Sequence, residues 1–214
     1  MKRKSSSSSY RFIVFEVDPE TARENLQEKI SSQSSKKLSN ISVSELDWSK
    51  PREVGHFVAC YNRIFLACPD PFRPITIEEA LTLADGRVTF LAHLYNRAVG
   101  FLISYIDFHQ IEGKLVPFGN IAGIGTIPER RRLGIALLLI LASSEYFLKK
   151  EVVSLRCEVY EKNNASLELV KSHGFREIGD NVLSSPTPKI PPWYAKLRAK
   201  KETGSKKINS KTSN

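Results

Sequence analysis

The sequence predicts an α/β domain of the α+β kind, in which helices flank a mixed, mostly antiparallel sheet. The chain has 214 residues, of which 41% are hydrophobic, enough for one sizeable core but short for two independent ones. Two strand-like runs in its first half are separated by only a few polar residues, which is typical of an antiparallel hairpin. Strands and helices alternate only in the second half, which predicts a single parallel crossover.

A strand and a helix are expected ahead of the main body. Residues 10–17 are rich in β-branched and aromatic residues, which favour a strand. Asp18 then offers an N-cap, and Pro19 suits the first turn of a helix. These elements are predicted to form an N-terminal extension, residues 10–40, of a core domain that spans residues 41–198.

The first half of the core is expected to hold a strand, two helices and a hairpin. Residues 41–45 alternate as a short strand, and residues 54–66 have the spacing of an amphipathic helix. Thr76 and Glu79 have the spacing of a capping box, which predicts a second short helix that ends near Gly86. The hairpin strands come next, over residues 88–95 and 99–108.

The second half is expected to alternate strand and helix. A strand over residues 120–127 is unusual for its internal glycines. A long helix over about residues 130–149 follows it, and then a strand over residues 152–160. A further helix over residues 165–173 and strand-like segments after Phe175 complete the predicted domain.

Positive charge is concentrated at the two ends of the chain. The formal net charge is +9, of which the first ten residues carry +3 and residues 196–214 carry +6, so the body between them is close to neutral. We expect basic tails over residues 1–9 and 199–214 to be disordered, because they hold few residues that could be buried. Such tails favour weak, salt-sensitive contact with nucleic acid, or serve only to keep the protein soluble.

Cysteine usage and hydropathy indicate the class of protein. Cys60, Cys68 and Cys157 are odd in number and lack C-x-x-C spacing, which argues against a disulfide framework and against a zinc site. The longest apolar run, residues 135–142, is far shorter than the roughly 20 residues that span a bilayer. We therefore expect a cytoplasmic protein with no bound metal and no membrane contact, as a monomer or a homodimer.

The strongest chemical signal is a cluster of arginines at the expected start of the long helix. Arg130, Arg131 and Arg132 stand where the helix dipole disfavours cations, by a few tenths of a kcal/mol to about 1 kcal/mol each. An anion bound by the unpaired N–H groups of the helix N-terminus would explain them, and the small residues Gly134 and Ala136 would let a polyphosphate approach the backbone. The alternative is a solvated helix start without a ligand.

Two glycines, Gly123 and Gly125, lie in the strand that precedes this helix. Glycine inside a strand weakens pairing and usually marks a bulge or the close approach of a ligand or another backbone. A strand that opens at these positions could hydrogen-bond an extended amide chain. Alternatively, the two glycines relieve crowding in a twisted core strand.

These residues fall in a pattern that resembles the acetyl-CoA signature of the GNAT superfamily of N-acetyltransferases. The signature is Thr-x-Pro-Glu-x-Arg-x-x-Gly-x-Ala, which stands here as Thr126, Pro128, Glu129, Arg131, Gly134 and Ala136. A second run resembles the family's Asn-x-x-Ala-x-x-Leu-Tyr-x-x-x-Gly-Phe pattern, through Asn163, Ser166, Leu169, Gly174 and Phe175. The two runs follow one another in the family's order, and the resemblance implies a GNAT-like fold.

The resemblance implies that acetyl-CoA is the cosubstrate and indicates how the chain would hold it. The backbone of Ile124, Gly125 and Thr126 would bind the pantetheine arm. Asn163 would touch the cofactor from the next strand-helix junction, or else serve as a helix cap. The loop that would wrap the pyrophosphate consists of Arg131, Arg132, Leu133, Gly134, Ile135, Ala136 and Leu137.

Glu158 is the candidate general base. Its predicted strand places four side chains on one face, those of Ser154, Arg156, Glu158 and Tyr160. A glutamate at this place looks like the general base of the similar ribosomal-protein N-terminal acetyltransferases. The alternative is a carboxylate that pairs with Arg156 on a polar strand face.

The chain departs from the family at the general acid. Where a tyrosine is common, seven residues after the asparagine, this chain has Val170, which has no proton to donate. A thiol pKa near 8.5 lets water protonate the leaving thiolate, so the departure does not exclude activity. The sequence offers three substitutes without a basis for ranking them, namely Tyr105, Tyr160 and His109.

The predicted activity is transfer of the acetyl group of acetyl-CoA to a primary amine by direct attack. The acceptor is a small-molecule amine, a protein N-terminus or a lysine, and the sequence does not choose among them. The alternative from another class is a non-catalytic or weakly active binding module with a GNAT fold, which its basic tails recruit to nucleic acid or ribosomes.

Overall fold

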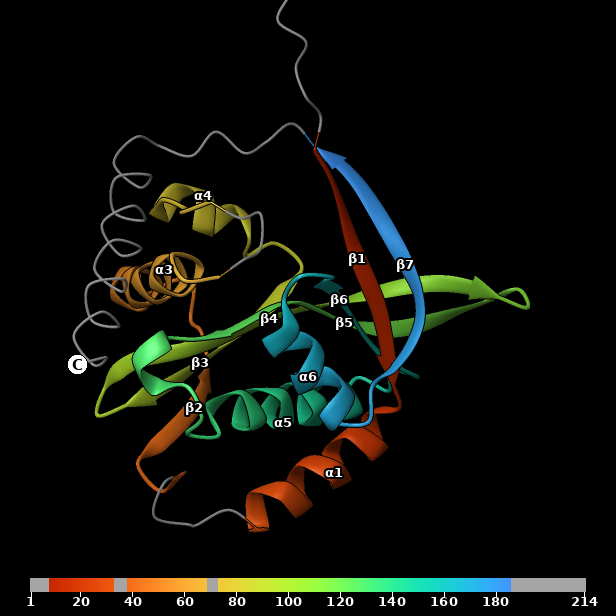
Figure 1. Ribbon diagram of the computed structural model, residues 1–214, viewed down its shortest axis with the longest axis horizontal. Helices are drawn as coiled ribbons and strands as arrows, with labels where there is room; N and C mark the ends of the chain where they lie inside the picture. The colour runs from red at the N-terminus through yellow and green to blue at the C-terminus, as the bar shows by residue number, and fades with distance from the viewer. Residues whose placement is uncertain (1–7, 33–37, 69–72, 186–214) are drawn as a thin grey trace, which may run out of the picture.

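The computed structural model describes residues 8–32, 38–68 and 73–185, and in this part of the chain helices flank a seven-stranded sheet (Figure 1). Its strand order is β2-β3-β4-β5-β6-β1-β7. Neighbouring strands are antiparallel except β5 and β6, which are parallel. The predicted mixed, mostly antiparallel sheet is therefore confirmed. The strands are β1 (Ser8–Val17), β2 (Ile41–Glu45), β3 (Arg87–Leu94), β4 (Arg97–Ile111), β5 (Lys114–Thr126), β6 (Leu155–Tyr160) and β7 (Arg176–Ser185).

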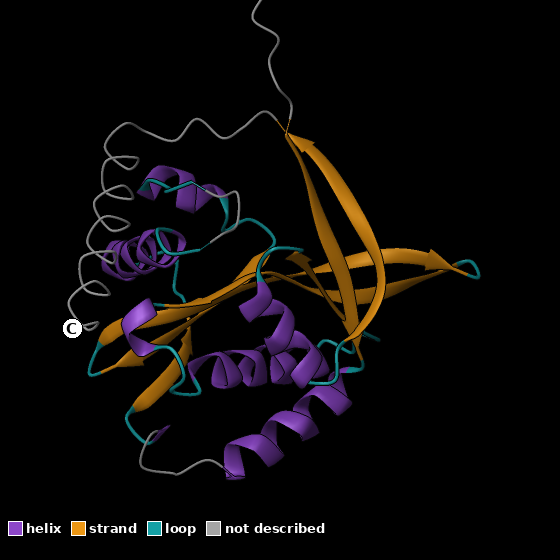
Figure 2. Cartoon of the chain, in the orientation of Figure 1, coloured by secondary structure: helices purple, strands orange, loops and turns teal. Residues whose placement is uncertain are grey.

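Helices cover both faces of the sheet (Figure 2). On one face, Phe57 of α3 meets the ring of Phe101 on β4 with centroids 5.5 Å apart. On the other face, Ser143 of α5 hydrogen-bonds Ser104 of β4 at 3.0 Å. No helix in the described ranges is long and apolar enough to span a membrane. The helices are α1 (Pro19–Ser32), α3 (Pro51–Phe65), α4 (Ile77–Thr82), α5 (Ile135–Leu148) and α6 (Asn164–Ser172), with a 3-10 turn, η1 (Pro128–Arg130).

The N-terminal strand is an interior strand of the sheet. β1 lies between β6 and β7, where Phe12 stands opposite Tyr160 on one side and Asn181 on the other. Ser8 and Ser9, which we expected in the tail, are its first two residues. The rest of the expected tails, together with residues 186–198 of the expected core, lies outside the described residues.

The capping box at the start of α4 is present. The hydroxyl of Thr76 accepts a hydrogen bond from the Glu79 N–H at 3.2 Å, and the Glu79 carboxylate accepts one from the Thr76 N–H at 2.9 Å. The reciprocal bonds satisfy two of the N–H groups that a helix start leaves unpaired. The helix ends at Thr82, earlier than the expected end near Gly86.

The long helix begins later than expected. α5 begins at Ile135, after an N-cap at Gly134 with φ of 80°, whereas the sequence predicted a start near Arg130. Arg130 ends the 3-10 turn, Arg131 is extended, and Arg132 has a φ of 65°. A left-handed residue cannot continue a right-handed helix. The arginines therefore lie in the loop that leads into α5 and not in its first turn.

Candidate active site

β5 and β6 pair only briefly and then part. Their register runs from Gly119 opposite Leu155 to Ile121 opposite Cys157. The pairing of β5 with β4 shifts at this point, and Ala122 is the extra residue of a bulge, which bends a strand and increases its twist. From Ala122 onward, within the described residues, the edge of β5 that faces β6 has no ladder partner.

The two glycines of β5 have different structural roles. A Cβ on Gly125 would lie 2.5 Å from Cγ2 of Ile64, so α3 can approach β5 only because this residue has no side chain. At this position the structure shows the relief of crowding that we considered as an alternative. A Cβ on Gly123 would meet nothing nearer than the ring of Phe101 at 3.7 Å, an ordinary contact, and Gly123 adjoins the bulge.

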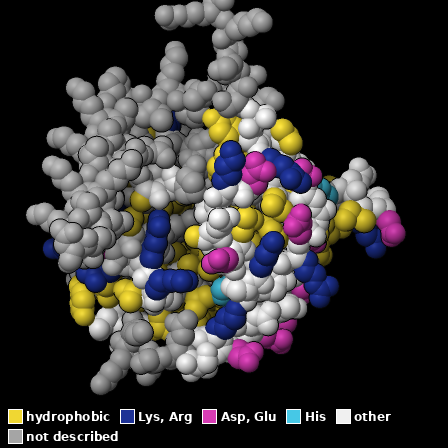
Figure 3. Space-filling view, in the orientation of Figure 1, with side chains coloured by type: hydrophobic (Ala, Val, Ile, Leu, Met, Phe, Trp, Pro, Cys, Tyr) yellow, Lys and Arg dark blue, Asp and Glu magenta, His cyan; other side chains and the backbone are white. Residues whose placement is uncertain are grey.

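A groove of about 660 Å³ runs between the loop before α5 and the start of α6. Figure 3 shows Lys and Arg side chains around a hollow on this face, beside hydrophobic ones. Leu133, which we expected in the cofactor loop, does not line the groove and packs against the hydrophobic core instead. The other predicted cofactor residues all line it: Ile124, Gly125, Thr126, Arg131, Arg132, Gly134, Ile135, Ala136, Leu137 and Asn163.

One end of the groove suits a polyphosphate. The N–H groups of Ile135, Ala136 and Leu137 belong to the first turn of α5 and so have no acceptor within the helix. The exposed side chains of Arg131 and Arg132 line the groove beside them. Backbone donors, the positive end of the helix dipole and guanidinium groups together favour a bound anion.

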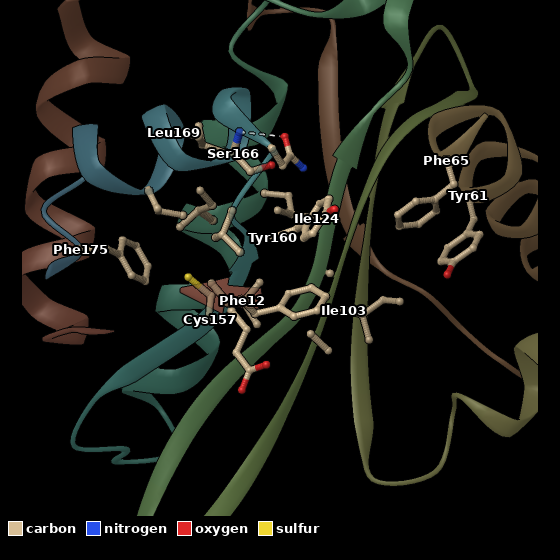
Figure 4. A pocket seen from close by; sticks show the side chains of 18 of the residues that line it. Phe12, Tyr61, Phe65, Ile103, Ile124, Cys157, Tyr160, Ser166, Leu169 and Phe175 are labelled. Carbon is tan, nitrogen blue, oxygen red and sulfur yellow. Dashed lines mark hydrogen bonds between the residues drawn. The ribbon is translucent and has the colours of Figure 1, made fainter. Parts of the chain in front are cut away.

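Asn163 is the N-cap of α6 and also lines the groove. Its Oδ1 accepts a hydrogen bond from the Ser166 N–H at 3.2 Å, drawn as the dashed line in Figure 4. Its Nδ2 donates to Sγ of Cys68 at 3.7 Å. The capping role that we gave as the alternative for Asn163 is therefore present, and it places the side chain between α6 and the end of α3.

A smaller cavity of about 240 Å³ continues from the groove between the parting strands. Figure 4 shows side chains that line it from both faces of the sheet, with Leu169 and Phe175 on one side and Tyr61 and Phe65 of α3 on the other. The groove and the cavity share four lining residues, Ile124, Asn163, Ser166 and Leu169. A molecule bound in the groove can therefore reach the opposite face of the sheet.

Glu158 lines this cavity from the part of β6 beyond the parting. Its Oε1 accepts a hydrogen bond from Nδ2 of Asn181 on β7 at 2.6 Å. Arg156, which we considered as its partner, instead forms an ion pair with Glu16 at 3.1 Å and stacks on the ring of Phe118 at 3.9 Å. The alternative of a Glu158–Arg156 pair is therefore wrong.

The candidate proton donors differ in whether they line the cavity. Val170 is buried and lines the cavity, so no proton donor stands where the family commonly has a tyrosine. Of the three substitutes, Tyr160 lines the cavity, whereas Tyr105 and His109 line neither cavity nor groove. Burial raises the pKa of Tyr105, which favours its neutral form.

Sequence reasoning missed the residues that close the far side of the cavity. Tyr61 and Phe65 stand four residues apart on α3, a spacing that puts two side chains on one helix face and that could have drawn attention to them. Phe12 and Asn181 come from strands near opposite ends of the described chain, and no local pattern links them. The missed residues are Phe12, Tyr61, Phe65, Leu83 and Arg87, which line the cavity, and Asn181, which hydrogen-bonds Glu158.

Solved structures of aminoglycoside acetyltransferases have similar folds. The enzyme meta-AAC0020, from an uncultured soil metagenomic sample and in complex with sisomicin, is 18% identical with a TM-score of 0.53 over 63% of this chain and 88% of that one. AAC(6')-Iy in complex with CoA is 19% identical, with a TM-score of 0.52 over 64% and 88%. AAC(6')-Ih from Acinetobacter baumannii is 20% identical, with a TM-score of 0.51 over 64% and 91%. At these sequence identities, the similarity shows that the proteins share a fold.

Sequence comparison places the chain in a family. No match was found among curated proteins. The model of the acetyltransferase (GNAT) family matches residues 42–175, which is more than half of the chain and includes the parting strands, the arginine loop and α6. The protein therefore belongs to the acetyltransferase (GNAT) family.

Proposed function

We propose that the protein is an N-acetyltransferase that transfers the acetyl group of acetyl-CoA to a primary amine by direct attack within a ternary complex. The observation that carries the proposal is the parting of β5 and β6, because it joins the groove beside the arginine loop to a cavity that the exposed carboxylate of Glu158 lines. Family membership supports acetyl transfer, and the similar enzyme AAC(6')-Iy was solved with CoA.

The groove would bind acetyl-CoA along its whole length. The first-turn N–H groups of α5, with Arg131 and Arg132, would hold the pyrophosphate. The unpaired edge of β5 from Ile124 to Thr126 would pair with the amide groups of pantetheine, as an added strand does. The thioester would then lie between the strands, where a backbone N–H near Gly125 can polarise its carbonyl.

The protein's own acid–base chemistry centres on Glu158. A primary amine is mostly protonated at neutral pH and must lose a proton before it attacks. The Glu158 carboxylate lines the cavity and would take that proton directly or through one water. The leaving thiol has a pKa near 8.5, so water can supply the last proton in place of a side chain at Val170.

An amine panel tests the activity directly. The purified chain is incubated with acetyl-CoA and a set of primary amines that includes peptides, lysine analogues and small molecules. CoA release is followed spectroscopically, and the acetylated product is identified by its mass. Acetylation of at least one amine faster than the uncatalysed rate supports the proposal. Binding of acetyl-CoA with no acetylated amine would contradict it and favour the binding module.

Thermal shifts test the cofactor groove separately. CoA should raise the melting temperature much more than pantetheine, which lacks the phosphates. Gly134→Leu should abolish the CoA shift. Gly113→Leu is the matched control, because Gly113 has nearly the same φ, 79° against 80°, in the β4–β5 turn away from the groove. Equal shifts from CoA and pantetheine would overturn the phosphate site.

A further inference from the structure

The wall of the cavity on the α3 face is mostly apolar and largely aromatic. Tyr61 and Phe65 of α3 pack with ring centroids 4.4 Å apart, and Phe12 of β1 meets Tyr160 of β6 at 5.6 Å. Ile103 of β4 completes this wall, and all five side chains are less than a tenth exposed. Leu83, at the C-cap of α4, is half-buried at the same cavity. Rings in such fixed packing offer a preformed surface for an apolar ligand.

The charge at the cavity is sparse and balanced. Among the described lining residues, Glu158 is the one acid and Arg87 the one base. A single carboxylate can pair with one ammonium group. A second or third ammonium group would lose its hydration against aromatic rings without a partner, and it would also be repelled by Arg87.

The cavity is also small. Its volume of about 240 Å³ is little more than a third of the groove's 660 Å³. Such a space suits an acceptor with a single ring or a short aliphatic body. It does not suit a sugar of several rings that carries many hydroxyl groups, because each hydroxyl would need a hydrogen-bond partner when buried.

We propose that the acceptor is a small monoamine with an aromatic or aliphatic body. The body lies against the wall made by Phe12, Tyr61, Phe65 and Ile103, and the amine faces Glu158. This inference rests on the proposed acetyltransferase function and narrows it. The proposed acceptor also differs from sisomicin, the aminoglycoside with which the similar enzyme meta-AAC0020 was solved.

Three amines test this substrate class with the full chain and acetyl-CoA. 2-Phenylethylamine carries one ammonium group on an apolar body, glucosamine carries one on a polar body, and sisomicin is an aminoglycoside. We expect kcat/KM for 2-phenylethylamine to exceed that for glucosamine by at least about 10-fold, because contacts in an apolar pocket discriminate by this order. A higher kcat/KM for sisomicin or glucosamine would overturn the substrate class and leave the acetyltransferase function standing.

Leu81 in α4 and Leu83 at its C-cap provide a matched pair of variants. Leu83→Asp puts a carboxylate into the apolar wall and should lower kcat/KM for 2-phenylethylamine about 10-fold or more. Leu81→Asp makes the same change at a residue that is 46% exposed and does not line the cavity, so it should leave kcat/KM within about 2-fold. Leu83→Ala provides a milder change if Leu83→Asp does not fold. Equal kcat/KM for the Leu81 and Leu83 variants would overturn the proposal.

Calorimetry separates a failure of this inference from a failure of the enzyme function. The CoA-loaded protein is titrated with 2-phenylethylamine and with sisomicin, which measures acceptor binding without turnover. Tighter binding of 2-phenylethylamine, weakened by Leu83→Asp and not by Leu81→Asp, supports the apolar site even if no acetyl transfer is seen. Tighter binding of sisomicin, or binding that is indifferent to Leu83→Asp, contradicts it.

Discussion

Asn181 donates a hydrogen bond from its Nδ2 to Oε1 of Glu158 at 2.6 Å, although the two residues lie on strands that do not pair with each other. β1 runs between β6 and β7, so the Asn181 side chain reaches across it. The N-terminal strand and the last described strand thus both help to position the candidate base.

Glu158→Gln should lower turnover by about 10²- to 10⁴-fold, since it keeps the size of the side chain and loses its basicity. The loss should shrink as the pH rises, because more of the acceptor amine is then already deprotonated. The thermal shift with CoA should not change. Glu16→Gln is the control, because Glu16 pairs with Arg156 on the neighbouring strand and does not line the cavity. Wild-type turnover in Glu158→Gln would remove Glu158 from the mechanism.

Gly125→Ala should destabilise the fold by about 1–3 kcal/mol, the usual cost of overpacking, because the new Cβ would lie 2.5 Å from Cγ2 of Ile64. Gly123→Ala, two residues earlier in β5, should cost much less, because its Cβ would only touch the Phe101 ring at 3.7 Å. Thermal melts of both variants measure the difference. Adding Ile64→Ala should recover part of the loss in Gly125→Ala beyond the sum of the two single changes. Equal melting temperatures for the two alanine variants would refute this packing account.

Cys68 should be the cysteine that reacts with iodoacetamide in the folded protein. Burial raises the pKa of both Cys60 and Cys157 to about 12, so little of either is thiolate at neutral pH. Cys68 is half-buried and lines the groove. CoA should therefore slow its alkylation, which peptide mass spectrometry can follow. Alkylation of Cys68 at the same rate with and without CoA would mean that the cofactor lies elsewhere.

Stability should fall as the pH drops below about 6.5, in part because of His173. This imidazole is 3% exposed, and burial lowers its pKa. Between the pKa of His173 in the folded chain and its higher pKa in the unfolded chain, the folded chain binds fewer protons. The contribution of His173 to stability is therefore complete above the pKa of the unfolded chain and is lost as the pH falls below it. Chemical denaturation between pH 5 and pH 8 measures this slope. His173→Gln should flatten it.

Local patterns account for the parts of the site that were predictable. The capping box of Thr76 and Glu79 is a contact between residues three apart, so its spacing alone reveals it. Gly134 and Ala136 are likewise two residues apart, at the N-cap and in the first turn of α5, so their spacing is visible in the sequence. The alternation of strands and helices over the second half predicted a single parallel crossover, and β5 and β6 form that parallel pair.

The sequence by itself determined the α+β class, the family signature and the contiguous loop that lines the groove, because each depends on neighbours along the chain. Only the tertiary structure decided where α5 begins, since a non-glycine residue such as Arg132 rarely adopts the left-handed backbone that keeps it out of the helix, and no sequence pattern marks it. It also decided that β1 completes the sheet, that Asn181 reaches Glu158, and that aromatic residues from α3 and β1 face one cavity. These residues are far apart in sequence, and strand pairing and helix packing alone bring them together.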